Sequence, residues 1–356
     1  MAKLDELLRL MRQHKASDIH LSSGSAPYLR VHGEMMKLNY REVAHELCQS
    51  LIFQILTDKQ KEIFAESLEL DFSYPLPEVG RFRVNVFMQR KGIAAVFRLI
   101  PEKAQTIEEL GLPEQLHDLI DVSEGLVLVT GPTGSGKSTT LASLIHSINS
   151  YERAHIITIE DPIEFVHEND KALISQREVS SHTKSFHAAL RAALREDPDI
   201  ILVGEMRDLE TISLAVTAAE TGHLVLATLH TNSAVKTVDR IIDAFPESQQ
   251  SQIRVMLSES LRGVVAQALL PTADGEGRVP VAEIMVNIPA VANMIREGKI
   301  HQVHSVMQTG RSYGMVTFET AVGELVRKKL ITKEVGDNFL ARRSAGAGNA
   351  GRYGKG

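Results

Sequence analysis

A glycine-rich segment that ends in a lysine and a serine carries the clearest chemical signal in the sequence. Residues 131–138 read GPTGSGKS and fit the phosphate-binding pattern G-x-x-x-x-G-K-[ST]. In this pattern backbone N–H groups turn toward the phosphates, the lysine reaches the β- and γ-phosphates, and the serine hydroxyl binds Mg²⁺. A chance glycine-rich turn is the alternative, but an apolar run precedes the segment and a helical pattern follows it. We therefore expect ATP and Mg²⁺ as cofactors, with nucleotide contacts from Gly131, Pro132, Thr133, Gly134, Ser135, Gly136, Lys137, Ser138 and Thr139.

Hydrolysis also requires carboxylates that hold the metal and orient the attacking water. The apolar run 200–203 leads to Glu205, and the apolar run 156–159 leads to Glu160, Asp161 and Glu164. Open parallel sheets bind ligands at the carboxyl ends of their strands. We expect Glu205 and Ser138 to be the metal ligands, and Glu205 and Glu164 to be catalytic. Glu160 and Asp161 are weaker candidates, since each could equally be a solvated loop residue.

Two histidines bracket the apolar run 224–229, His223 before it and His230 after it. A single histidine at a strand end is usually a hydrogen-bonded structural residue. His230 also stands where it could sense the γ-phosphate. The residues alone therefore leave both roles open.

The segments that carry these residues predict an α/β fold. Apolar runs at 126–129, 156–159, 200–203 and 224–227 alternate with helical patterns at 138–148, 186–195 and 209–221. This alternation is typical of a parallel sheet that is covered by helices on both faces. Residues 232–340 are expected to be mostly helical.

The first hundred residues have a different pattern and predict a separate α+β domain. Helical patterns at 4–11, 43–56 and 59–65 mix with strand-like segments at 28–31, 81–86 and 93–100. Strict alternation in 81–86 places Arg81 and Arg83 on one face of a strand. We expect an N-terminal domain at 1–100, a linker at 101–112, an ATPase domain at 113–343 and a disordered tail at 344–356.

Composition excludes several classes of protein. The net charge of −6 does not favour nucleic-acid binding, and a single cysteine, Cys48, excludes an internal disulfide or a multi-cysteine zinc site. No apolar run approaches the ~20 residues that span a membrane, and the N-terminus lacks the apolar core of a signal peptide. We expect an intracellular protein that is soluble or at most peripheral to a membrane.

Four segments together resemble the secretion and type IV pilus ATPase superfamily, and within it the branch of pilus-retraction ATPases. They are 131–138, 158–167, 194–208 and 221–231, in the order of that family's Walker A, Asp box, Walker B and His box. The single cysteine and the short N-terminal region differ from the extension and type II secretion branches. Segments 196–199 and 206–210 resemble the main retraction branch more than the accessory one.

The resemblance implies a RecA-like P-loop ATPase domain with a smaller N-terminal PAS-like domain. It implies a cytoplasmic homohexamer at the inner face of the bacterial membrane, where MgATP hydrolysis drives pilus retraction and twitching. The implied partners are the inner-membrane platform protein of the pilus machine and the paralogous accessory retraction ATPase, with no nucleic acid. It further implies catalytic roles for His223, His230, Arg81, Arg83 and Arg98.

Residues 290–297 depart from the family at one position. The retraction branch typically carries an arginine where this chain has Ala292. Val291, Met294 and Ile295 repeat at helical spacing and predict an amphipathic helix. Its other side carries Arg296 and Glu297, which either form a solvated face or couple turnover to the pilus machine.

The sequence is also compatible with three other functions. The chain could be an accessory retraction ATPase, a P-loop regulatory or scaffold protein that binds ATP without useful turnover, or a ring-shaped nucleic-acid translocase. The carboxylates at Glu164 and Glu205 argue against the scaffold, and the acidic charge argues against the translocase.

Overall fold

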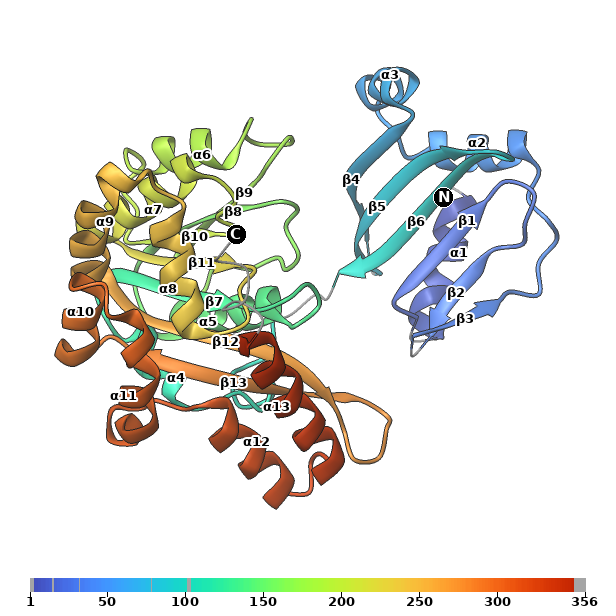
Figure 1. Cartoon of the computed structure of the whole chain (residues 1–356). Coiled ribbons are helices and arrows are strands. Elements are labelled where there is room, and N and C mark those ends of the chain that lie inside the picture. The colour runs from blue at the N-terminus through green and yellow to red at the C-terminus, as the bar shows by residue number, and fades with distance from the viewer. Residues whose placement is uncertain (1–2, 15, 32, 78, 101–103, 349–356) are drawn as a thin grey trace, which may run out of the picture. The chain divides into compact units, whose positions relative to one another are not determined.

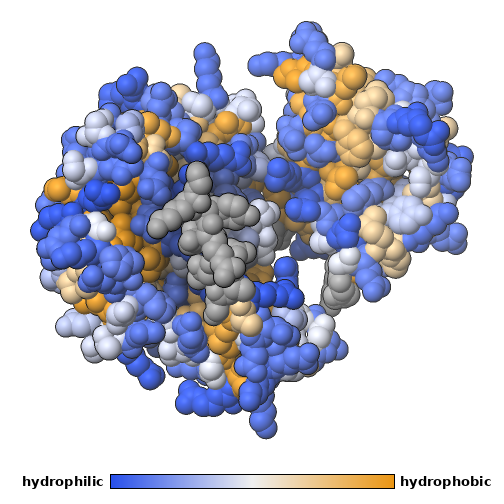
Figure 2. All heavy atoms as spheres, in the orientation of Figure 1, coloured by the Kyte–Doolittle hydropathy of each residue, from blue (hydrophilic) through white to orange (hydrophobic). Residues whose placement is uncertain are grey.

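The computed structural model describes residues 3–14, 16–31, 33–77, 79–100 and 104–348, with side chains described as far as Arg343. The chain divides into two compact units, Met1–Lys103 and Ala104–Gly356. Figure 1 shows the elements of each unit. Among the described residues, no helix has both the length and the apolar character needed to cross a bilayer. The face drawn in Figure 2 is mostly hydrophilic, with hydrophobic residues in smaller groups.

The first unit is an antiparallel sheet with three helices. The sheet has the strand order β3-β2-β1-β6-β5-β4. Alternation in β5 buries Phe82, Val84 and Val86 and leaves Arg81 and Arg83 together on the opposite face, as predicted. The elements are α1 (Lys3–Gln13), β1 (Asp18–Ser22), β2 (Tyr28–Val31), β3 (Glu34–Lys37), α2 (His45–Phe53), α3 (Asp58–Ser67), β4 (Glu69–Leu76), β5 (Gly80–Gln89) and β6 (Gly92–Ile100).

The second unit contains the parallel sheet that the apolar runs predict. The strand order is β13-β12-β7-β11-β10-β8-β9, and all neighbouring pairs are parallel except β12 with β13. Every residue of β7, β10 and β11 is buried, because helices cover both faces of these strands. The predicted α/β class is confirmed. The elements of this part are α4 (Gln115–Ile120), β7 (Gly125–Thr130), α5 (Lys137–Tyr151), β8 (His155–Glu160), β9 (Leu173–Glu178), α6 (Phe186–Ala193), β10 (Ile200–Val203), α7 (Leu209–Glu220) and β11 (Leu224–Leu229).

The C-terminal part corrects the prediction that residues 232–340 are mostly helical. Two long strands, β12 (Leu261–Pro271) and β13 (Arg278–Val286), extend the sheet beyond β7. Their sequences are short apolar runs without strict alternation, which periodicity cannot distinguish from buried helix. The remaining elements are α8 (Ala234–Asp243), α9 (Glu247–Ser260), α10 (Pro289–Arg296), η1 (Ile300–Gln302), α11 (Val303–Thr309), η2 (Gly310–Tyr313), α12 (Phe318–Arg327) and α13 (Lys333–Gly348).

Two predicted boundaries differ from the structure. Ile107 and Leu112, expected in the linker, are buried in the core of the second unit, so residues 104–112 belong to that unit. Helix α13 runs to Gly348 and includes the first five residues of the expected tail. The rest of the expected tail, 349–356, and residues 101–103 lie outside the described residues.

Candidate nucleotide site

The glycine-rich loop connects the end of β7 to the start of α5. Gly131, Gly134 and Gly136 have φ values of 149°, 79° and 90°, a region that side-chain-bearing residues rarely adopt. A Cβ at Gly131 would collide with the backbone oxygen of Gln267. A Cβ at Gly136 would lie 2.9 Å from Nε2 of the same glutamine. Sterics and backbone conformation therefore both require glycine in this loop.

Gln267, which the sequence analysis did not identify, braces the loop from the neighbouring strand β12. Its side chain is buried, Nε2 donates to the Ser135 carbonyl at 2.9 Å, and Oε1 accepts from Thr140 Oγ1 at 2.7 Å. One amide thus ties the loop to the first turns of α5. Gln267 could have been recognised from the sequence as the one polar residue inside the apolar run 263–270.

The loop has the features of a phosphate cradle. Lys137 Nζ donates to the carbonyls of Gly131 at 2.9 Å and Pro132 at 3.2 Å, so the ammonium lies against the loop. Ser135 Oγ is buried and has no hydrogen-bond partner among the described residues. A Cβ at Gly134 would meet open space. These residues fit a triphosphate, and Ser138 and Thr139 follow Lys137 in the first turn of α5.

Two predicted carboxylates lie near Lys137. Burial lowers the pKa of Lys137, while the negative charges of Glu205 and Glu164 act in the opposite direction. Glu205 is at the carboxyl end of β10, two residues after Val203. The structure therefore brings these three predicted residues together at one edge of the sheet.

The Glu205 carboxylate contacts an arginine and a histidine, one at each oxygen. Its Oε1 lies 2.9 Å from His230 Nε2, and its Oε2 lies 2.7 Å from Arg207 Nη2. Partial burial opposes ionisation, but the Arg207 hydrogen bond and the charges of His230, Arg207 and Lys137 outweigh it and lower the pKa of Glu205. Glu205 is consequently an anion at neutral pH. Arg207 was not among the predicted site residues.

Glu164 is exposed on the loop after β8, and Glu160 at the end of that strand holds the loop in place. The Glu160 carboxylate accepts from Thr158 Oγ1 at 2.6 Å and Gln176 Nε2 at 3.1 Å, and also from the backbone of Glu164. Burial raises the pKa of Glu160. Asp161 is exposed on the same loop. Of these three residues, only Glu164 acts on the charge of Lys137, whereas Glu160 supports the loop that carries Glu164.

His223 lies at the opposite edge of the sheet from the phosphate loop. It precedes Leu224, which pairs with Gly125 at the start of β7, whereas the loop follows the end of β7. Its Nδ1 lies 3.0 Å from the carbonyl of Ala218 on α7. The structure thus brings His230, but not His223, to Glu205, and this placement does not support a role for His223 in hydrolysis within its own subunit.

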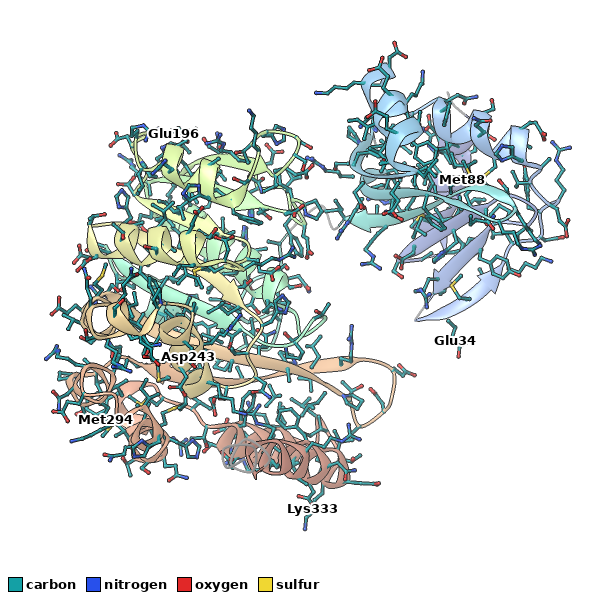
Figure 3. The ribbon with its side chains drawn as sticks, turned by 45° about the horizontal axis from the view of Figure 1, so that its top comes forward. Glu34, Met88, Glu196, Asp243, Met294 and Lys333 are labelled. Atoms are coloured by element: carbon teal, nitrogen blue, oxygen red, sulfur yellow. The ribbon has the colours of Figure 1, made fainter. Side chains whose placement is uncertain are left out.

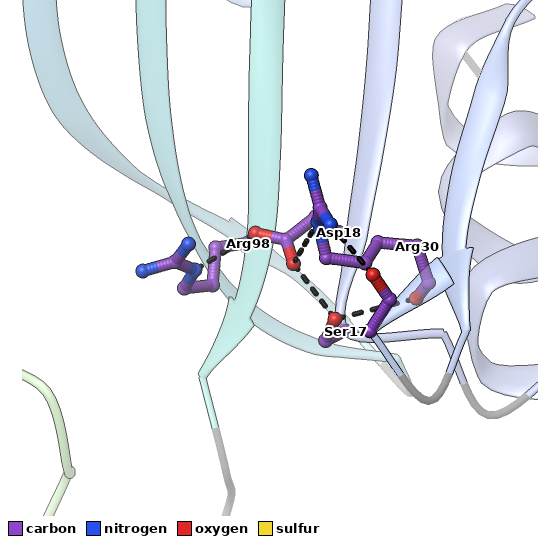
Figure 4. Close-up of polar contacts among 5 residues, drawn as sticks. Ser17, Asp18, Arg30 and Arg98 are labelled. Atoms are coloured by element: carbon purple, nitrogen blue, oxygen red, sulfur yellow. Dashed lines mark hydrogen bonds and ion pairs between the residues drawn. The ribbon is translucent and has the colours of Figure 1, made fainter. Parts of the chain in front are cut away.

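Two of the three predicted arginines of the first unit, Arg83 and Arg98, lie in a row of charged residues across its sheet. Arg30, Asp18, Arg98 and Arg83 occupy directly paired positions on β2, β1, β6 and β5. Asp18 is buried and accepts from Arg98 Nε at 2.8 Å, with Arg30 Nε 4.0 Å away (Figure 4). Arg81, on the face that Arg83 shares, donates from Nε to Ser73 on β4. A single buried carboxylate thus orients the Arg98 side chain.

Comparison with known proteins adds an independent line of evidence. Residues 2–351 match the family of type II/IV secretion system proteins. The type IV pilus retraction ATPase PilT of Pseudomonas aeruginosa is 54% identical over 93% of this chain and 96% of its own. The type IV pilus ATPase PilU of the same organism is 41% identical over 93% and 87%. A crystal structure of the pilus retraction motor PilT with bound ADP matches with a TM-score of 0.89 and 46% identity, over 94% of this chain and 96% of that one.

The strand–loop–helix around Lys137, with carboxylates at the ends of neighbouring parallel strands, defines a P-loop ATPase with a RecA-like fold. The chain belongs to the family of type II/IV secretion system proteins.

Proposed function

We propose that this chain is a MgATP-hydrolysing motor that retracts type IV pili and so drives twitching motility. The observation that carries the proposal is the joint placement of Lys137, Glu164 and Glu205 in a chain that matches PilT over nearly the whole length of both. A regulatory protein that only binds ATP would not need both carboxylates beside the phosphate loop. The higher identity to PilT than to PilU favours the main retraction motor over the accessory one.

The residues of the site have separable roles in this proposal. The loop N–H groups and Lys137 bind the phosphates, and Ser138 and Glu205 hold Mg²⁺, which supplies positive charge against the triphosphate. Glu164 orients the attacking water and accepts its proton. His230 keeps the Glu205 carboxylate oriented through the 2.9 Å contact. Arg81, Arg83 and Arg98 stabilise charge at the nucleotide of a neighbouring subunit.

The proposed assembly is a homohexamer in the bacterial cytoplasm, peripheral at the inner face of the cytoplasmic membrane. Its proposed partners are the inner-membrane platform protein of the pilus machine and the paralogous accessory retraction ATPase. A strain that lacks the gene tests this function. It should keep surface pili, seen by electron microscopy, and lose twitching, and the natural chain should restore twitching where Lys137→Ala does not. Loss of the pili themselves would contradict the proposal.

Helix α10 is the proposed surface for coupling turnover to the pilus machine. Val291 and Ile295 are fully buried, as the helical spacing predicts, while Arg296 and Glu297 are exposed. Figure 3 marks Met294 on this helix. Glu297 is paired with Lys299 at 2.7 Å, a surface contact that contributes little stability.

Replacing Arg296 and Glu297 by alanine should leave ATP turnover within about twofold of normal, because exposed charges rarely affect stability. Twitching should be lost, since the coupling surface is removed. Ala292→Arg, which restores the family pattern, should strengthen retraction without changing turnover. Phosphate release and a twitching-zone assay measure the two effects. Joint loss of turnover and motility in the double variant would make the helix structural.

A further inference from the structure

Arg343 on α13 connects the C-terminal helices to the backbone beside the candidate catalytic residues. Its guanidinium carbon lies 3.8 Å from the centre of the Phe318 ring on α12 and 5.6 Å from that of Phe339. Its Nη1 donates to the carbonyl of Asn232, which is 111 residues earlier in the chain. Helices α12 and α13 lie side by side in Figure 1. An arginine held over aromatic rings loses little further freedom when it forms such a hydrogen bond.

Asn232 stands in the middle of a five-residue segment, residues 230–234, that begins at the catalytic edge of the sheet. At one end, His230 Nε2 lies 2.9 Å from Glu205 Oε1. At the other end, the Ala234 N–H donates to Glu283 Oε1 at 2.9 Å, and Glu283 is a buried residue of β13. The segment is therefore fixed at its far end by the C-terminal strand and at its centre by Arg343.

Two carboxylates partly offset the burial of Arg343. Burial lowers the pKa of Arg343, and the charges of Glu283 and Glu319 act in the opposite direction. Burial also raises the pKa of Glu283. The hydrogen bond from the Ala234 N–H and the charge of Arg343 act to lower it. Each group therefore stabilises the charged form of the other, and both hydrogen-bond to the 230–234 segment.

We propose that Arg343 is a positioning residue for His230, and that docking of α13 through Arg343 thereby sets the rate of hydrolysis at Glu205. The inference rests on the proposed ATPase function. Arg343 holds the Asn232 carbonyl and so restrains the backbone two residues after His230, whose imidazole contacts Glu205. Loss of this hydrogen bond frees the centre of the segment while leaving the phosphate loop and the arginines of the first unit unchanged.

The test replaces Arg343 by methionine, which preserves the aliphatic contact with the Phe318 ring, and uses the full chain. We expect kcat to fall about tenfold, equivalent to ~1.4 kcal/mol, with KM for ATP changed by less than about twofold. The kcat of Arg343→Lys should lie between those of Arg343→Met and the natural chain, because lysine keeps the charge but loses the planar fork. The neighbouring Arg342 is exposed, and Arg342→Ala is the matched control with unchanged kcat.

A second pair of measurements separates positioning from simple attachment of the helix. In a His230→Ala background, Arg343→Met should cause no further loss of kcat, and hydrogen exchange of the amides in 229–234 should rise in Arg343→Met but not in Arg342→Ala. An equal loss of kcat in both backgrounds, or unchanged exchange in 229–234, would overturn the inference. If the natural chain and Arg342→Ala both lack turnover, the proposed ATPase function fails, and the exchange measurement alone then decides the position of the segment.

Discussion

Glu205→Gln should bind ATP at least as tightly as the natural chain and hydrolyse it roughly 10²–10⁴-fold more slowly, the range that positioned acid–base and metal-holding groups supply. The substitution keeps the shape of the side chain, so Arg207 and His230 can still hydrogen-bond to it. It removes the negative charge, which at neutral pH is ensured by the lowered pKa of Glu205. Affinity is maintained or rises because one anion that repels the triphosphate is gone.

Glu164→Gln should behave in the same way for a different reason. Glu164 is exposed on its loop, and Glu160 and Gln176 hold that loop independently of the Glu164 side chain. The amide therefore changes the chemistry of the water-orienting group without moving the loop. Phosphate release measures turnover, and a fluorescent nucleotide measures binding. Glu168→Gln, an exposed acid on the same connection, should be normal in both assays. If Glu205→Gln or Glu164→Gln kept the kcat of the natural chain, that residue would not belong to the site.

The parallel sheet and the phosphate loop were predictable because their signals are local. The strands β7, β8, β10 and β11 are apolar runs, and a glycine-rich or acidic segment follows β7, β8 and β10 within a few residues. The edge strand β9, Leu173–Glu178, is partly exposed and mostly polar, and it was not predicted. The strand β4 was not predicted although its signal is also local, since Leu70, Phe72, Tyr74 and Leu76 stand at alternate positions. The strands β12 and β13 had none, since Val264, Val265 and Ala266 form one continuous buried run.

The supports of the site could not be predicted from the sequence, because they come from distant parts of the chain. Gln267 and Thr140 are separated by 127 residues and meet only because β12 pairs with β7. Glu160 stands in an acidic segment that suggests chemistry, yet its burial and its hydrogen bonds to neighbouring residues show a supporting role. Periodicity and motifs indicate which residues can react. Tertiary contacts decide which residues hold them in place.

The proposed action of Arg81 and Arg83 on a neighbouring subunit predicts recovery of activity in mixed rings. A chain with both arginines replaced by alanine should lose roughly 10³–10⁵ in kcat, as when an arginine is withdrawn from a transferred phosphoryl group. That loss corresponds to about 4–7 kcal/mol of barrier. A Lys137→Ala chain should be inactive because it cannot bind the phosphates. Each chain alone therefore forms an inactive ring.

Mixing the two chains in equal amounts should restore turnover well above that of either ring alone. In a ring with head-to-tail interfaces, about a quarter of the interfaces would pair an intact Lys137 with intact arginines from the adjacent subunit. If the arginines instead served the nucleotide of their own subunit, no site in a mixed ring would be complete. Arg90→Ala, an exposed arginine at the turn after β5, should be active without mixing and controls for loss of surface charge. Light scattering and differently tagged chains establish that mixed rings form, and mixed rings without recovered turnover would place the arginines in their own subunit's site, or outside the site altogether.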